Sequence, residues 1–163
     1  MFGDERGYFF ESYNKKIFAE AGLDLDFLQD NESKSSKGVL RGLHFQAPPF
    51  DQGKLVRVAK GSVLDVSVDI RKDSSTYGQW ASFELSEYNK RMLWIPPGFA
   101  HGFVSLQDDT IFIYKCTNVY NRGSEGSILW SDPELAIDWG IRDPVVSDKD
   151  QQAPLFREFK SPF

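Results

Sequence analysis

Residues 54–70 read KLVRVAKGSVLDVSVDI, and this stretch indicates the class of fold. The pair Lys60-Gly61 has the composition of a tight turn, and it separates two runs in which valine and leucine recur. A turn between two such runs predicts a hairpin of strands over 54–59 and 62–70.

The second of these strands alternates between apolar and polar side chains, as a strand with two different faces does. Apolar residues occupy one face and polar residues the other: Val66, Val68 and Ile70 against Asp65, Ser67 and Asp69.

Five further runs have strand composition, and turn-forming residues separate them. They are residues 39–45, 80–85, 92–95, 102–106 and 111–119. One helix is indicated over 15–21, with Asn14 as its N-cap and Gly22 as its stop. Many short strands at regular spacing predict an all-β fold, an antiparallel sandwich or barrel with one or two short helices. We expect a single domain over residues 1–163, with a loop-rich tail from Asp132 onward.

Composition narrows the classes of function. The chain has 19 basic and 24 acidic residues and a net charge of -5. This balance argues against a general nucleic-acid or membrane-surface binder, but it leaves room for one cationic pocket that holds a phosphorylated small molecule. The single cysteine, Cys116, rules out an internal disulfide. No apolar run is long enough to span a bilayer and the start is charged, so we expect a cytoplasmic protein.

The only two histidines, His44 and His101, are the candidates for imidazole chemistry. Strict alternation in the strand around His44 puts Arg41 on the opposite face, so the two share a site only if Gly42 breaks the register. The alternative is a single hydrogen-bonded core histidine. His101 follows a Pro-Pro-Gly turn, which suits either a positioned acid–base group or a structural role. Two histidines without a His-x-His pair argue against a metal site.

Two further segments contain groups that can transfer or orient a proton. The run 111–120 places Tyr114, Cys116 and Tyr120 on one face if alternation persists. Cys116 is most simply a small buried residue, and Tyr114 is either a packing group or a general acid. The run 147–150 reads SDKD, which is either a solvated loop or the source of a carboxylate that orients an imidazole.

Taken together, these segments resemble the dTDP-4-dehydrorhamnose 3,5-epimerase family of cupin-type jelly rolls. The matching pieces occur in the family's order over essentially the whole chain: 4–11 (DERGYFFE), 29–31 (QDN), 38–46 (GVLRGLHFQ), 54–56 (KLV), 65–71 (DVSVDIR), 96–103 (PPGFAHGF), 114–117 (YKCT) and 147–150 (SDKD).

The resemblance implies an isomerase that needs no metal or other cofactor and works by deprotonation and reprotonation beside a C4 ketone. By similarity, His44 is the base and Asp150 orients its imidazole, with Asp148 as the fallback if the loop register differs. Tyr114 matches the proton donor. Lys54 matches the position that stabilises the enolate oxygen.

The same resemblance implies residues that bind the dTDP-sugar substrate, and a homodimer. The binding positions are Arg6, Glu11, Gln29, Asn31, Arg41, His101, Tyr120, Glu125 and Lys149. Among them, the cations Arg6, Arg41 and Lys149 match the pyrophosphate pocket, and Tyr120 matches the ring that stacks on the thymine. If Arg41 and His44 share this cleft, Gly42 must carry a bulge, which we predict.

The chain departs from the family pattern at two places. Glu32 stands where the family usually has a histidine after Gln-Asp-Asn. The first motif is entered at Phe2, whereas relatives usually carry an N-terminal segment before it. That segment would form an outer strand that helps to build the dimer, so we expect a more exposed sheet edge here.

Four readings follow. The first is epimerisation at C3 and C5 of dTDP-4-dehydro-6-deoxy-D-glucose to dTDP-4-dehydro-L-rhamnose. The second is epimerisation at one carbon, or 3,4-ketoisomerisation, on the same nucleotide-sugar. The third is a jelly roll that binds a nucleotide-sugar without catalysis, although a binder has no need of a base, an orienting carboxylate and a phenol together. The fourth is a metal-dependent cupin enzyme, which the histidine count disfavours.

Overall fold

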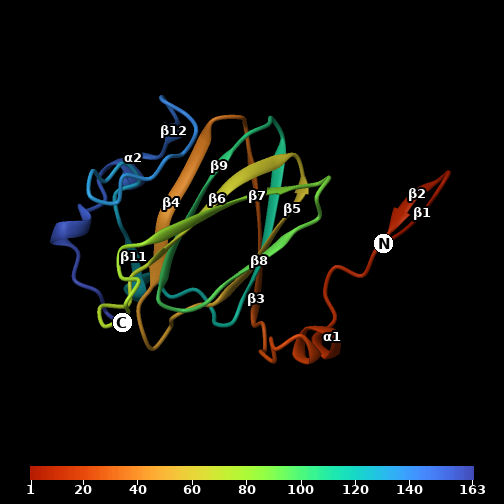
Figure 1. Ribbon diagram of the computed structural model, residues 1–163, viewed down its shortest axis with the longest axis horizontal. Coiled ribbons are helices and arrows are strands. Elements are labelled where there is room, and N and C mark those ends of the chain that lie inside the picture. The colour runs from red at the N-terminus through yellow and green to blue at the C-terminus, as the bar shows by residue number, and fades with distance from the viewer.

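The computed structural model describes residues 1–163, and strands make up most of its regular structure (Figure 1). The elements in chain order are β1 (Phe2–Asp4), β2 (Gly7–Phe9), α1 (Lys15–Glu20), β3 (Gln29–Ser35), β4 (Val39–Gln46), β5 (Lys54–Lys60), β6 (Ser62–Asp69), β7 (Trp80–Ser86), β8 (Met92–Ile95), β9 (Phe99–Ser105), β10 (Thr110–Cys116), η1 (Arg122–Ser124), β11 (Glu125–Ser127), β12 (Val145–Val146), α2 (Asp148–Gln151) and η2 (Phe156–Glu158).

Two sheets form the body of the molecule. The smaller has the strand order β3-β10-β5-β8, and the larger has the order β11-β4-β9-β6-β7, with β12 added beside β4. Every pairing is antiparallel except that of β12 with β4. The predicted antiparallel β-sandwich is therefore confirmed, and its two sheets can be followed in Figure 1.

One core lies between the two sheets. Val56 and Phe112 from the smaller sheet pack with Val63 and Phe103 from the larger. The rings of Phe103 and Phe112 stack with their centroids 4.3 Å apart. This layer joins the sheets and leaves the space beside it for a cleft.

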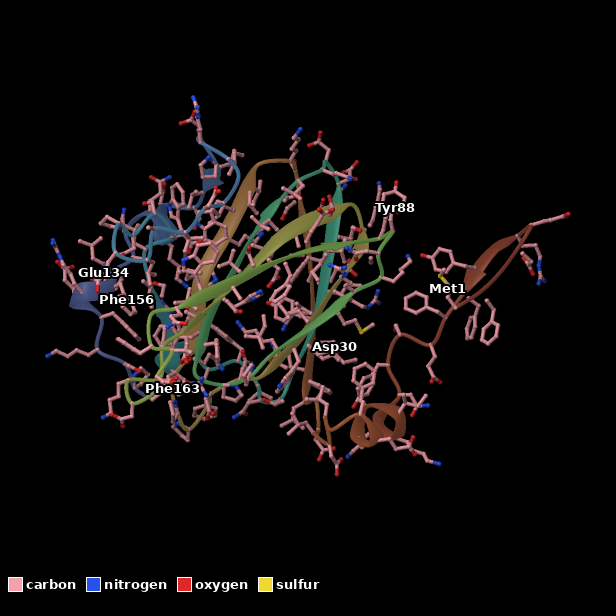
Figure 2. All side chains as sticks on the ribbon, viewed as in Figure 1. Met1, Asp30, Tyr88, Glu134, Phe156 and Phe163 are labelled. Atoms are coloured by element: carbon pink, nitrogen blue, oxygen red, sulfur yellow. The ribbon has the colours of Figure 1, made fainter.

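A second core lies on the outer face of the larger sheet, where the loop-rich tail covers it. Leu135, Trp139 and Phe156 from the tail pack against Val66 and Val68 of β6. The indole of Trp139 donates a hydrogen bond of 2.9 Å to the carbonyl of Trp130. Figure 2 shows Phe156 and Phe163 on this side of the molecule. Both faces of β6 are consequently buried.

The predicted hairpin over 54–70 is wrong, although its two strands exist. β5 pairs with β10 and β8, whereas β6 pairs with β7 and β9. Gly61, at a φ of +79°, turns the chain from one sheet into the other. A turn signal indicates that the chain reverses, but it does not indicate which strand becomes the partner.

Other element boundaries differ less. β3 was not expected, because its sequence QDNESKS has no apolar residue to mark a buried face. β9 begins at Phe99 rather than at residue 102, and β10 ends at Cys116 rather than at residue 119. The predicted helix is confirmed as α1, and the side chain of Asn14 accepts hydrogen bonds from the first-turn amides.

The N-terminal arm, residues 1–12, leads away from this body. Its hairpin β1–β2 is a separate two-stranded sheet that lies apart from the sandwich in Figure 1. Phe2 is 79% exposed and Phe9 is 71% exposed. No helix in the structure has the length and apolar character needed to cross a membrane.

Candidate active site

A cleft of about 450 Å³ opens between the two sheets. β4 and β9 of the larger sheet form one wall, β5 and β10 of the smaller sheet form the other, and residues 145–150 form part of the rim. The predicted site residues that line it are Arg41, His44, Lys54, His101, Tyr114, Lys149 and Asp150.

His44 and Asp150 form a hydrogen-bonded pair in this cleft. Nε2 of His44 lies 2.6 Å from Oδ1 of Asp150, and the backbone amide of Gly42 donates to Oδ2 at 3.3 Å. Asp150 lies on α2, whose N-cap Ser147 accepts a hydrogen bond from the Asp150 amide. Burial raises the pKa of the Asp150 carboxyl, but the hydrogen bond and charge of His44 outweigh burial and lower it. Asp150 is therefore the partner of His44, and the fallback Asp148 is exposed.

The predicted bulge at Gly42 is confirmed. The register between β4 and β9 shifts between Arg41 and His44, so both side chains reach the cleft. Gly42 has a φ of +137°, and a Cβ built there would lie 2.5 Å from the Cα of Gly102. Only glycine fits this crossing of the two strands.

Tyr114 lies on β10, in the sheet that faces His44. Its hydroxyl has no hydrogen-bond partner within the chain, and burial raises the pKa of the phenol. The phenol therefore keeps its proton at neutral pH and can donate it to a bound molecule. Cys116, two residues along the same face, is buried as expected.

Lys54 is the buried cation of the cleft. It lies at the start of β5 and makes no hydrogen bond or ion pair with the rest of the chain. Burial lowers the pKa of its ammonium group, while Cys116, Asp65 and Glu125 oppose that change. An ammonium group without a partner can interact with a negative charge that develops on a ligand.

His101 forms a second pair with a carboxylate that the sequence did not indicate as functional. Its Nε2 lies 2.9 Å from Oδ2 of Asp65 on β6, and both side chains are buried. Alternation along β6 had placed Asp65 on the polar face. Topology reveals what that face meets, because it turns toward the inside of the sandwich and toward β9.

A neighbouring pocket of about 380 Å³ shares His44, Lys54 and Tyr114 with the cleft. The other predicted residues in it are Gln29, Asn31, Tyr120 and Glu125. The sequence did not indicate Gln46 and Gln52, which also line it and which both donate hydrogen bonds to backbone carbonyls. Tyr120 lies beyond the end of β10, so the expected continuous strand face stops before it.

The two cations at the rim have different partners. Arg41 is exposed and donates hydrogen bonds to Ser35 and to the carbonyl of Lys34. Lys149 pairs with Glu125 at 2.6 Å, and the hydroxyl of Tyr120 donates to the other oxygen of Glu125. Burial raises the pKa of Glu125, but Lys149 and Tyr120 lower it overall.

Three residues lie outside the cleft of their own chain. Arg6 and Glu11 belong to the exposed N-terminal arm, and Arg6 pairs only with the neighbouring Asp4. Glu32 lies on β3 with its side chain exposed, next to Ser33, which lines the cleft. Alternation therefore turns Glu32 to the outer face of the smaller sheet. No group of three or more His, Cys, Asp or Glu side chains is placed to hold a metal ion.

Comparison with known proteins identifies one family. The sequence model of a family described as dTDP-4-dehydrorhamnose 3,5-epimerase matches residues 1–158. The dTDP-4-dehydrorhamnose 3,5-epimerase of Salmonella typhimurium is 59% identical over 157 residues, which cover 95% of this chain and 86% of that protein. The enzyme of the same name from Shigella flexneri is 57% identical over 157 residues, covering 96% of this chain and 87% of the relative.

A solved structure gives the same result for the fold. The dTDP-6-deoxy-D-glucose-3,5-epimerase of Legionella pneumophila, in complex with dTDP-4-keto-L-rhamnose, superposes with a TM-score of 0.93. It is 52% identical to this chain, and the match covers 98% of this chain and 85% of that one.

Proposed function

The chain belongs to the dTDP-4-dehydrorhamnose 3,5-epimerase family, an isomerase family, and from this premise we propose how its cleft performs the reaction. The substrate is dTDP-4-dehydro-6-deoxy-D-glucose, and the product, dTDP-4-dehydro-L-rhamnose, is inverted at C3 and C5. Each inversion removes a proton from a carbon next to the C4 ketone and returns one from the other face of the sugar.

One observation carries this proposal: the base and the acid come from opposite sheets. His44 lies on β4 of the larger sheet, and Tyr114 lies on β10 of the smaller one. Both line the same cleft. A sugar ring held between the sheets presents one face to the imidazole and the other to the phenol, which is the arrangement that inversion at a carbon needs.

His44 acts through Nδ1, because its Nε2 is bonded to Asp150. Nδ1 takes the proton from carbon, and the electron pair of the broken C–H bond moves into the C3–C4 or C4–C5 bond and on to the ketone oxygen. The Asp150 carboxylate, with its lowered pKa, stays ionised and stabilises the imidazolium that forms. Tyr114 then donates its proton to the carbon, and its phenolate regains a proton from water.

Lys54 stabilises the enolate oxygen between the two proton transfers. It has no other partner in the chain, so its charge is available when the oxygen becomes negative. A preorganised charge of this kind contributes about 10²–10³-fold to the rate.

The phosphates bind at the rim, where Arg41 and Lys149 supply positive charge, and the thymine stacks on Tyr120 in the neighbouring pocket. Glu125 holds Lys149 in the free protein. The pyrophosphate therefore competes with the Glu125 carboxylate for this ammonium group.

The first prediction concerns solvent exchange at the two carbons. With dTDP-4-dehydro-6-deoxy-D-glucose in D2O, NMR will show deuterium entering at both C3 and C5. His44→Ala will lose this exchange by at least about 10²-fold, while the nucleotide-sugar still binds. Exchange at one carbon would instead assign a mono-epimerase or ketoisomerase. Binding without any exchange in the wild-type protein would contradict the catalytic roles proposed here.

We propose further that two copies of this chain form a homodimer in which each N-terminal arm reaches the partner's cleft. An isolated two-stranded hairpin has little stability of its own, and this arm exposes Phe2, Tyr8 and Phe9. Arg6 and Glu11, which match substrate-binding positions, lie outside the cleft of their own chain. A partner's cleft gives these residues a place in the site.

The second prediction tests this arrangement by mixing two inactive variants. Arg6→Ala lacks the arm's cation and His44→Ala lacks the base. If the arm acts on the partner, a mixed dimer holds one site with both residues, and random exchange restores about a quarter of the sites. Light scattering checks that dimers are present. A mixture that remains as inactive as its components would contradict the exchange of arms.

A further inference from the structure

Asp65 is a buried carboxylate that does not itself line the cleft. It is 0% exposed, on β6 between the two sheets. Its Oδ2 bonds to Nε2 of His101, whereas its Oδ1 is buried and has no hydrogen-bond partner at all. Burial raises the pKa of the Asp65 carboxyl, and His101 and Lys54 oppose that rise.

A half-satisfied buried carboxylate is costly for the stability of a protein. An unpaired carboxylate oxygen loses its hydration without a replacement, and a neutral or apolar residue at the same place avoids that loss. Asp69, four residues along the same strand, shows the contrast. Its carboxylate accepts hydrogen bonds from Arg71, Ser74 and Thr76. Asp65 has only one such bond, so stability alone does not explain a charge at that position.

The contact with His101 suggests what the charge does. The imidazole of His101 lines the cleft and stacks against Phe112, with ring centroids 6.1 Å apart. Its Nε2 is used by Asp65. Its Nδ1 has no partner in the chain and is not among the sealed atoms, so it faces the cleft. Whether that nitrogen accepts or donates a hydrogen bond depends on which nitrogen carries the proton.

We propose that Asp65 is a positioning residue for the epimerisation, because its carboxylate holds the His101 proton on Nε2 and so presents Nδ1 to the sugar as a hydrogen-bond acceptor. An acceptor at this point fixes a sugar hydroxyl, and with it the ring, between His44 and Tyr114. This inference rests on the proposed function for its effect on turnover, but the state of the His101 ring can be observed without any substrate.

The test compares two buried aspartates of the same strand. Asp65→Asn keeps the size of the side chain but removes the charge, so His101 is no longer restricted to one tautomer. Asp69→Asn is the matched control, since Asp69 is as deeply buried but bonds only to Arg71, Ser74 and Thr76. Because the chain has only two histidines, ring-¹⁵N NMR of histidine-labelled protein resolves His101 from His44.

We expect the wild-type spectrum to show His101 protonated at Nε2, and the Asp65→Asn spectrum to show this state lost or mixed. Turnover of Asp65→Asn should fall about 10- to 100-fold, while its melting temperature stays the same or rises. Asp69→Asn should do the opposite: a lower melting temperature, with the His101 signals and turnover unchanged.

Two results would overturn the inference. One is a His101 ring whose protonation is the same in the wild type and in Asp65→Asn. The other is a loss of turnover in Asp65→Asn that merely follows a loss of stability, as in the control. Failure of the proposed function would look different, because the wild type itself would then show no turnover, and the ring spectra alone would decide the role of Asp65.

Discussion

The pKa values of the three buried aspartates differ with the hydrogen-bond donors that surround them. Several donors from residues 71–76 hold the pKa of Asp69 far below its ordinary value. Asp150 has His44 and the Gly42 amide, and its pKa is lowered as well. Asp65 has one imidazole, and burial raises its pKa. The same residue type thus serves as an anchor for a loop, as the partner of a base and as an orienting group.

The third prediction concerns the pH dependence of Asp150→Asn. Because the folded pKa of Asp150 is lowered, its stabilisation is complete above the unfolded value of about 4 and is lost as the pH falls through the folded value. The variant should therefore be less stable by about 1–3 kcal/mol at pH 7. Its stability should also fall less steeply below about pH 4.

Urea unfolding at a series of pH values measures this difference. Asp148→Asn is the control, because Asp148 lies exposed on the same helix and makes no bond to His44. It should follow the wild-type curve. Equal acid slopes for wild type and Asp150→Asn would show that the His44–Asp150 bond does not stabilise the carboxylate. Turnover of Asp150→Asn should also fall about 10²–10⁴-fold.

At the scale of elements, the crossing of β4 and β9 decides which side chains reach the cleft. Gly42 and Gly102 pass so closely that neither has room for a Cβ. The register shift at this crossing turns Arg41 and His44 to the same side. The bulge is thus the local feature on which the proposed base depends.

The fourth prediction is that Gly42→Ala loses both stability and activity. A Cβ there would lie 2.5 Å from Gly102, and the φ of +137° disfavours any L side chain. We expect a loss of about 2–4 kcal/mol in the free energy of unfolding, together with a large loss of turnover.

Gly140→Ala separates strain from steric clash. Gly140 also has a positive φ, +67°, but a Cβ there meets nothing within 4 Å. Its cost should be about 1 kcal/mol, with turnover retained. If Gly42→Ala behaved like this control in chemical denaturation and in turnover, the crossing would be looser than the structure indicates.

For the whole molecule, the C-terminal segment has two roles. It covers the outer face of the larger sheet through Leu135, Trp139 and Phe156, and it carries Asp150 into the cleft. Trp139 lies directly behind the strand crossing, within 3.2 Å of where a Cβ of Gly102 would be. Packing of the outer core and geometry of the site are therefore coupled.

The fifth prediction is that Trp139→Ala destabilises the protein by about 3–5 kcal/mol, because a buried indole and its hydrogen bond to Trp130 are lost. Thermal and urea unfolding measure this loss. Phe83→Ala is the control: Phe83 is 42% exposed on the edge strand β7, and its removal should cost less than about 1 kcal/mol. Similar costs for the two variants would contradict the second core.

Much of the fold and most of the site could be predicted from the sequence. The strands of residues 39–46 and 54–69 were found, and the bulge at Gly42 and the pairing of His44 with a carboxylate near residue 150 were expected from the family resemblance. β3 was missed because a polar strand buried mainly by its neighbours has no apolar period to detect. Asp65 was missed because alternation indicates a face but not what that face meets.

The sequence by itself determined the class of the fold, the short list of imidazoles and the family, since alternation, turn residues and motifs are written in neighbouring positions. Only the tertiary structure decided which strands pair, which aspartate meets which histidine and where Arg6 and Glu11 lie. These contacts join residues far apart in the chain, such as His44 and Asp150, which are 106 positions apart. Their geometry follows from how two sheets and a C-terminal segment pack together, and no local pattern contains that information.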